Sequence, residues 1–157
     1  MKIEELENAP QWLLDANTHN ADVDIIDGVV HWYDGSWYGG IWYGGIWYYG
    51  VWNYGTWHGG TWQDGVWHNG TWKGGVWKNG IWKNGKWEHG NWKNGVWHDG
   101  IWEYGIWKNG TWKNGYWLNG VWQSGHWHEG YWYGGKWEKG YKSINKLVHS
   151  DTPPTND

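Results

Sequence analysis

The chain has 157 residues, enough for a single domain, and it contains 23 Trp and 28 Gly but neither Phe, Cys nor Arg. Without Cys, a disulfide framework is excluded. The first eight residues are acidic and no long apolar run occurs. We therefore expect a protein without a recognisable secretion signal and without membrane association.

The net charge of −4 is unevenly distributed. Residues 1–30 carry one Lys and seven acidic residues, whereas residues 31–140 carry nine Lys and seven acidic residues. A body this close to neutrality is not a strong polyanion binder, and the chain lacks the Arg side chains best suited to phosphate and guanine contacts. We therefore do not expect nucleic acid as a partner.

Residues 1–30 are predicted to form an N-terminal cap followed by lead-in strands. Asn8 and Gln11 have the spacing of a helix-capping pair, and Pro10 suits the first turn of a short helix. Residues 21–30 then alternate in polarity and turn at Asp27-Gly28, which is typical of paired strands. We expect this segment to cover the open end of the repeat array that follows.

Residues 31–140 consist of twenty-two uninterrupted pentads of the form x-Trp-x-x-Gly. We label the five positions a to e, with Trp at b and Gly at e. Position a is β-branched in fourteen pentads and position d is Asn, Asp or Gly in fifteen, so a to c predict a short strand and d–e a turn. A helix is excluded, because each Gly would cost about 1 kcal/mol relative to Ala.

The Trp side chains are predicted to point inward. Side chains alternate along a strand, so Trp points to one face and positions a and c to the other. Position c carries much of the charge, and twenty-two exposed indoles would form an apolar surface larger than soluble monomers tolerate. We therefore expect a structural core of Trp, with members such as Trp42, Trp62, Trp82, Trp102 and Trp122.

Two all-β architectures fit the pentad. In an antiparallel meander of very short strands, Asn-Gly at d–e would form tight hairpins and both residues would need positive φ. In a β-solenoid, coils stack through parallel strands, and a type II turn needs positive φ only at Gly. Position d also holds residues that resist positive φ, namely Tyr49, Tyr54, Tyr104, Glu129 and Lys139. We therefore predict a single β-solenoid and keep the meander as the alternative.

The array resembles the pentapeptide-repeat proteins, which form right-handed, four-sided β-helices with four pentads per coil. In that family a central Leu or Phe points inward together with a small residue two positions earlier. Here Trp82 occupies such a central position and Gly80 the earlier one, although the family's Ala-Asp/Asn-Leu wording is absent. The chain is more similar still to Trp-rich pentad arrays of tailed phages. The resemblance implies a right-handed solenoid with four pentads per coil, located in the host cytoplasm or the virion.

Position a alone leaves the number of sides open. Grouping the pentads by fours gives one apolar column, formed by Ile41, Thr61, Ile81, Ile101 and Val121. Grouping them by threes gives a comparable column, formed by Val51, Val66, Ile81, Val96 and Thr111.

Outward-facing Tyr and Lys at position c form the candidate contact surface. The Tyr residues of four consecutive pentads would ring one coil of a four-sided solenoid, and Tyr is enriched at interfaces. The Lys residues could attract an acidic or phosphate-bearing partner, although both residue types also suit solvated strands. The candidates are Tyr33, Tyr38, Tyr43, Tyr48, Lys73, Lys78, Lys83 and Lys93.

No pattern in the chain indicates catalysis or a cofactor. It contains no nucleophile–base pair, no phosphate-binding loop and no metal signature, and His126 and His128 have no third ligand nearby. We therefore expect no catalytic residue, no metal and no cofactor. Residues 141–157 are predicted to close the array and then to form a disordered tail.

These patterns predict a non-enzymatic, rigid repeat scaffold that acts as a protein-interaction module or as a phage particle component. The expected partner is an unknown protein, and an uncovered solenoid end would allow self-association. The alternative is a carbohydrate- or nucleotide-binding solenoid that uses the Tyr and Lys rows.

Overall fold

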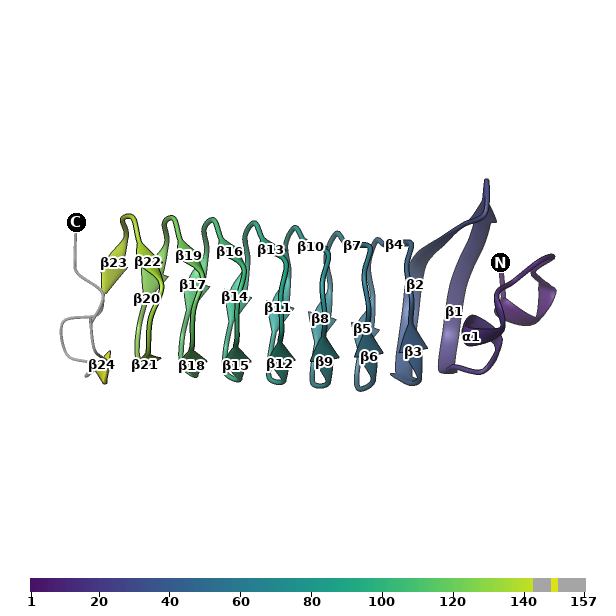
Figure 1. Ribbon diagram of the computed structural model, residues 1–157. Coiled ribbons are helices and arrows are strands. Elements are labelled where there is room, and N and C mark those ends of the chain that lie inside the picture. Colours follow the sequence, from purple (N-terminus) through teal and green to yellow (C-terminus); the bar gives the residue numbers. More distant parts are fainter. Residues whose placement is uncertain (143–147, 150–157) are drawn as a thin grey trace.

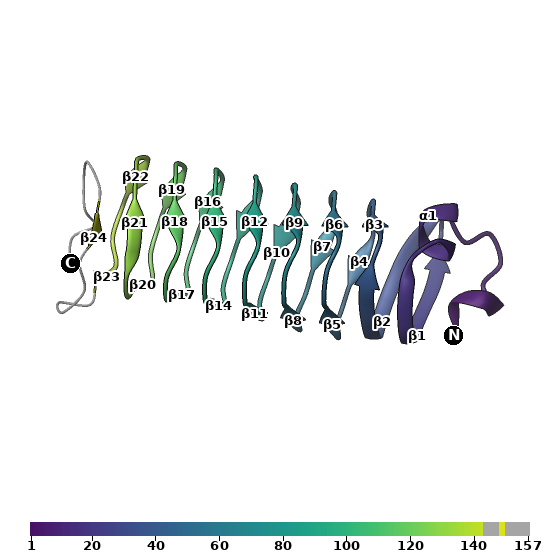
Figure 2. The same ribbon diagram turned by 90° about the horizontal axis from the view of Figure 1, so that it is seen from below.

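The computed structural model of the chain is a β-solenoid of about seven turns, and it describes residues 1–142 and 148–149. Short parallel strands stack side by side along a straight axis, and the N-terminal segment lies at one end of the stack (Figure 1). Seen from below, the same stack shows its coils in one continuous series (Figure 2). The predicted solenoid is therefore confirmed, and the antiparallel meander is wrong for the repeat array.

Each coil contains three pentads, so the predicted four pentads per coil are wrong. Every strand of the array pairs with the strand fifteen residues away, as Val76 does with Asn91 and Trp77 with Trp92. The physical reason lies in the size of indole. Consecutive Trp rings meet edge to face, as Trp77 and Trp82 do at 5.9 Å and 74°, so three rings already fill the cross-section of a coil.

The N-terminal segment consists of two short helices and a long hairpin: η1 (Ile3–Glu5), α1 (Gln11–Leu14), β1 (Asn17–Ile26) and β2 (Val29–Gly39). β1 and β2 are antiparallel and join at Asp27-Gly28, where both residues have positive φ (51° and 78°) as in a type I′ turn. The predicted capping pair is wrong: the N-cap of α1 is Pro10 and it makes no side-chain hydrogen bond, while Asn8 has a left-handed φ of 60°. α1 packs on β3, with the Trp12 ring 5.2 Å from the Trp42 ring at 70°.

The three sides of the solenoid are three ladders of two- or three-residue strands. β2 begins the first two sides, through His31–Trp32 on the first and Ser36–Trp37 on the second. The first side continues with β4 (Ile46–Trp47), β7 (Thr61–Trp62), β10 (Val76–Trp77), β13 (Asn91–Trp92), β16 (Ile106–Trp107), β19 (Val121–Trp122) and β22 (Lys136–Trp137).

The second side continues with β5 (Val51–Trp52), β8 (Val66–Trp67), β11 (Ile81–Trp82), β14 (Val96–Trp97), β17 (Thr111–Trp112), β20 (His126–Trp127) and β23 (Tyr141–Lys142). The third side comprises β3 (Ile41–Trp42), β6 (Thr56–Trp57), β9 (Thr71–Trp72), β12 (Lys86–Trp87), β15 (Ile101–Trp102), β18 (Tyr116–Trp117), β21 (Gly130–Trp132) and β24 (Val148–His149). The predicted closing segment and tail lie mostly outside the described residues.

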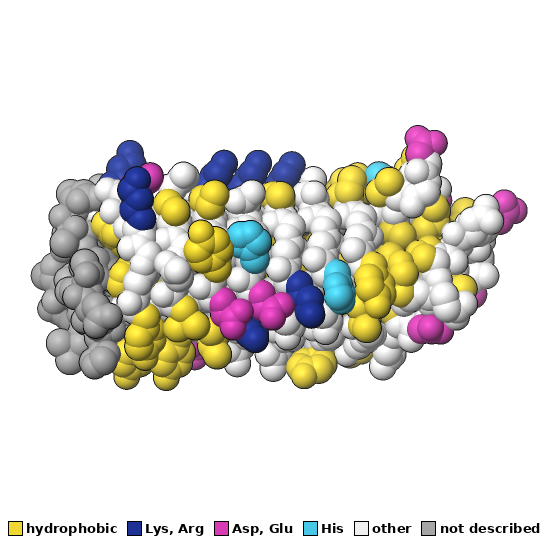
Figure 3. All heavy atoms as spheres, viewed as in Figure 1, with side chains coloured by type: hydrophobic (Ala, Val, Ile, Leu, Met, Phe, Trp, Pro, Cys, Tyr) yellow, Lys and Arg dark blue, Asp and Glu magenta, His cyan; other side chains and the backbone are white. Residues whose placement is uncertain are grey.

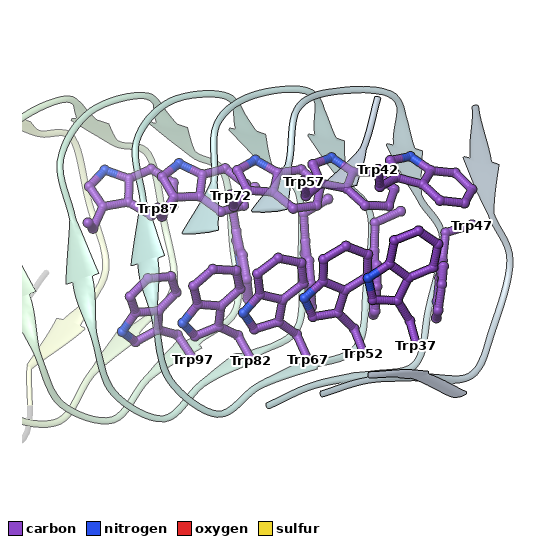
Figure 4. Packing of buried hydrophobic residues seen from close by; sticks show 14 of the residues in the cluster. Trp37, Trp42, Trp47, Trp52, Trp57, Trp67, Trp72, Trp82, Trp87 and Trp97 are labelled. Carbon is purple, nitrogen blue, oxygen red and sulfur yellow. The ribbon is translucent and has the colours of Figure 1, made fainter. Parts of the chain in front are cut away.

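The core is three columns of stacked indoles. Trp67, Trp82 and Trp97 lie in one column, with ring centroids 4.7 Å apart and planes within 6° (Figure 4). The Trp side chains from Trp32 to Trp127 are fully buried. Nine indole N–H groups also donate to a carbonyl of the next coil at 3.0–3.2 Å, as Trp82 Nε1 does to the Asp99 oxygen. The five Trp residues singled out above are all buried and are spread over the three columns: Trp62 and Trp122 on the first side, Trp82 on the second, Trp42 and Trp102 on the third.

The corners explain the residues at positions d and e. Gly at e has a φ between 101° and 147° throughout the array, whereas no residue at d has positive φ, so the turn places its strain on Gly alone. Asn and Asp at d have another use: the side-chain oxygen accepts the N–H of the following Gly, as Asn69 does from Gly70 at 2.8 Å. Tyr, Glu and Lys fit the same position because its backbone is unstrained.

Two adjacent glycines test this account of the corner. A Cβ on Gly60, whose φ is +105°, would overlap the carbonyl oxygen of Gly45 one coil away, whereas a Cβ on Gly59 would lie 4.0 Å from its nearest neighbour, the Tyr43 oxygen. We expect Gly60→Ala to lower the free energy of unfolding by about 2 kcal/mol or more. Gly59→Ala should leave it unchanged or raise it by up to about 1 kcal/mol, because Ala restricts the unfolded chain. Chemical denaturation of both variants measures the difference, and equal effects would contradict the account.

Candidate interaction surface

The side chains at position c form three straight rows, one on each side of the solenoid. A coil contains fifteen residues, so residues at c are neighbours when their numbers differ by fifteen. The backbone holds this register through N–H groups at a and c, as Val76 N donates to the Gly60 oxygen (3.0 Å) and Lys78 N to the Trp62 oxygen (2.8 Å). The c rows therefore present their side chains at the spacing of the strands, about 4.8 Å.

The row on the first side contains three consecutive lysines. Lys78, Lys93 and Lys108 are exposed, and the neutral side chains of Gln63 and Gln123 flank them. Lys side chains stand in a line over β10, β13 and β16 (Figure 3). Within residues 1–142, none of the three takes part in an ion pair. This Lys row is an uncompensated strip of positive charge.

The row on the second side alternates Lys and His. His98 lies between Lys83 and Lys113, one coil away on either side. Partial burial lowers the pKa of the His98 imidazole, and the two ammonium groups lower it further. The predicted Lys83 thus has a histidine as its neighbour in the row and lies on a different side from Lys78 and Lys93.

The row on the third side is compensated by opposite charges. Lys73 precedes Glu88 and Glu103, and Lys86 at position a pairs with Glu103 at 3.2 Å and Glu88 at 3.6 Å. The hydrogen bond and the negative charge of Glu103 raise the pKa of the Lys86 ammonium. Exposed pairs of this kind contribute little to stability, about 0–1 kcal/mol. Their effect is to keep this side close to neutral.

The four predicted Tyr residues do not ring one coil. With three pentads per coil, Tyr33, Tyr38 and Tyr43 lie on the three sides, and Tyr48 stacks on Tyr33 with ring centroids 5.2 Å apart. The Tyr48 hydroxyl also lies 3.1 Å from His31 Nδ1. Local desolvation, together with Asp24 and neighbouring groups, raises the pKa of the Tyr33 phenol. Tyr43 stacks on His58 at 4.7 Å.

Sequence reasoning missed an aromatic patch near the other end of the third side. Tyr116, Leu118, Tyr131 and Tyr133 are each exposed by about 40%, and Tyr116 stacks on Tyr131 at 5.0 Å. The signal was present in the sequence, because Tyr116 and Tyr131 are separated by fifteen residues, as are Leu118 and Tyr133. It could be found only once the length of the coil was known.

The His126–His128 pair is the one cluster of potential ligands that the sequence singled out in the array. His126 and His128 stack with ring centroids 4.1 Å apart, and no group of three potential metal ligands occurs among the residues that the structure describes. In the same part of the chain, no helix has the length and apolar character needed to span a bilayer.

Comparison of the chain with protein-family models, curated proteins and solved structures finds no match.

The pKa of His98 tests the neighbours that a three-pentad coil assigns to it. Lys83→Gln should raise this pKa, because it removes a positive charge one coil away. Lys78→Gln should leave it unchanged, although Lys78 would be the neighbour in a four-pentad coil. Titration of the imidazole signals by NMR measures both, and the reverse pattern would contradict the register.

The same pKa predicts the direction of a pH effect on stability. The folded state disfavours the charged imidazole of His98, so the unfolded chain binds the proton more readily. The contribution of His98 to stability is therefore present above the unfolded pKa of about 6.5 and is lost as the pH falls below it.

Proposed function

We propose that the protein is a non-enzymatic, rigid scaffold that acts as a protein-interaction module. The observation that carries the proposal is the unbroken register of the array: from β2 to β22 each coil repeats the last, and no loop is inserted between coils. Enzymes usually position catalytic groups on loops held by a rigid framework. The corners of this solenoid carry no inserted loops on which such groups could stand. A straight surface with side chains at fixed spacing suits the recognition of another surface.

The Lys row is the part of this surface that we assign to a partner. Lys78, Lys93 and Lys108 are exposed and adjacent, their neighbours in the row are Gln63 and Gln123, and Glu138 further along the row pairs with Lys136. Complementary charge speeds the encounter of two proteins and fixes their register. The proposed partner is a protein that presents an acidic strip or strand to this side of the rod.

The aromatic rows favour a protein over a glycan or nucleotide as the ligand. A sugar or base stacks on the face of an aromatic ring. The Tyr33 ring already stacks on Tyr48, and the Tyr43 ring on His58, so ring edges and hydroxyls remain for a partner. Edges and hydroxyl groups suit the mixed contacts of a protein interface.

The resemblance to the Trp-rich arrays of tailed phages supports a location for this function. On that basis the rod belongs either to the phage particle or to the cytoplasm of the infected host. A particle component would join copies or neighbouring proteins at fixed distances, and a cytoplasmic module would hold a host factor. Both roles use the same rigid surface.

Affinity capture with two matched variants tests the proposal. A tagged protein is expected to retain one stoichiometric partner from host lysate, and Lys78→Gln/Lys93→Gln/Lys108→Gln should lose most of it. The control Lys73→Gln/Lys83→Gln/Lys113→Gln removes the same charge from the other sides and should retain it. Equal retention by both variants would contradict the assignment of the Lys row, and a co-purifying glycan or nucleotide would support the alternative function.

A further inference from the structure

A groove of about 760 Å³ lies at the N-terminal end of the rod, away from the Lys row. It is lined on the one hand by the N-terminal segment, with Glu7 before α1 and Trp12 within it, and on the other by the end of the β1–β2 hairpin, with Asp27 and Val29. Its floor reaches Tyr43 at the start of the third side. The hairpin rises from the stack on one side and α1 lies on the other (Figure 1).

Half of the residues that line the groove are aromatic or aliphatic. Trp12 is partly buried, and its ring meets the Tyr43 ring edge to face, with the centroids 6.1 Å apart and an angle of 63° between the planes. Val29 and Tyr43 are 41% and 53% exposed, and Ile25 and Val30 also line the groove. Apolar side chains gather between the hairpin tip and the N-terminal segment (Figure 3). Exposed apolar surface of this kind commonly marks a binding site.

The charge of the groove is negative. Glu7 from the N-terminal segment and Asp27 from the hairpin turn both line it, and its lining contains no Lys. Neither carboxylate takes part in an ion pair within the described part of the chain. The surrounding residues 1–30 carry seven acidic side chains against the single Lys2, which lines a different hollow.

We infer that this groove binds a short segment of a partner protein that carries Lys or Arg beside aliphatic residues. A cationic head would meet the carboxylates of Glu7 and Asp27, and its aliphatic stem would lie against the side chains of Trp12 and Tyr43. The volume of the groove and its mixture of acidic and apolar lining residues suit a chain segment rather than a single small cation. The inference rests on the proposed function and names a second surface, with the opposite charge preference from the Lys row.

Labelled synthetic peptides provide the test, with fluorescence anisotropy on the full chain as the measurement. The probe is a peptide in which Lys and Leu alternate. One control peptide replaces Lys with Glu and another replaces Leu with Ser. We expect the Lys–Leu peptide to bind and both controls to bind at least about tenfold more weakly, because each lacks one of the two contacts. Equal binding of the Lys–Ser peptide would mean attraction by net charge alone and would overturn the inference.

Matched variants locate the site. Glu7→Gln/Asp27→Asn should weaken binding by about tenfold, and Asn at position 27 preserves the turn, because Asn-Gly is the preferred type I′ pair. Glu4→Gln/Asp15→Asn removes the same charge outside the groove lining and should change binding by less than about twofold. Tyr43→Ser should weaken binding, whereas Tyr38→Ser, at the same position c on the second side, should not.

Three further outcomes would overturn the inference. The groove variants and their controls could bind alike, or the Glu–Leu peptide could bind as tightly as the Lys–Leu peptide. Sedimentation could also show that the chain self-associates and that Glu7→Gln/Asp27→Asn abolishes this association, which would make a second copy the occupant. Each of these results leaves the scaffold function standing if the Lys row still retains its partner, so the two proposals fail separately.

Discussion

The stacking of each indole on the indole fifteen residues away determines the rest of this structure. Parallel strands lie about 4.8 Å apart, and aromatic rings in contact prefer a similar separation. The ring centroids within the columns lie 4.6–5.1 Å apart, so one spacing satisfies both the backbone hydrogen bonds and the ring contacts. A coil that differed in length from its neighbours would lose both sets of contacts together. This shared spacing accounts for twenty-two pentads without an insertion.

The same constraint shapes the surface. Because the corners of successive coils approach closely, position e accepts only Gly, while positions a, c and d remain free to vary. Function can therefore change along the rod without change in the core. In this chain the freedom is used to segregate charge: the Lys row lies on the first side, the third side is neutralised by Lys86 and its partners, and the acidic groove lies at the N-terminal end. Two surfaces of opposite charge are thus held at a fixed separation.

Much of this fold could be predicted from the sequence, because the repeat expresses local rules. The charge at position c indicates that Trp points inward, and Tyr49 or Lys139 at position d disfavours tight hairpins, which need positive φ there. The number of sides could not be predicted, because it depends on how three or four indoles fill a cross-section. Position a offered equally good columns for both. Because the length of the coil was predicted wrongly, the predicted contact residues lie on different sides of the solenoid. The four-pentad coil placed Tyr33 to Tyr48 in one coil, and it did not reveal the alignment of Lys78, Lys93 and Lys108. The groove depends on how α1 meets the hairpin, and no local pattern indicates it.

The most direct measurement of the central claim is disulfide formation between engineered cysteines, since the chain has none of its own. Val76 and Asn91 are partners in adjacent strands of the first side, and parallel neighbours at about 4.8 Å fall within the Cα range for a disulfide. We predict that Val76→Cys/Asn91→Cys oxidises within one chain, with loss of both free thiols. Thr71→Cys/Asn91→Cys, which would be neighbours in a coil of four pentads, should keep its thiols, because these residues belong to different sides. Bridging of the second pair and not the first would contradict the three-pentad coil and the Trp columns built on it.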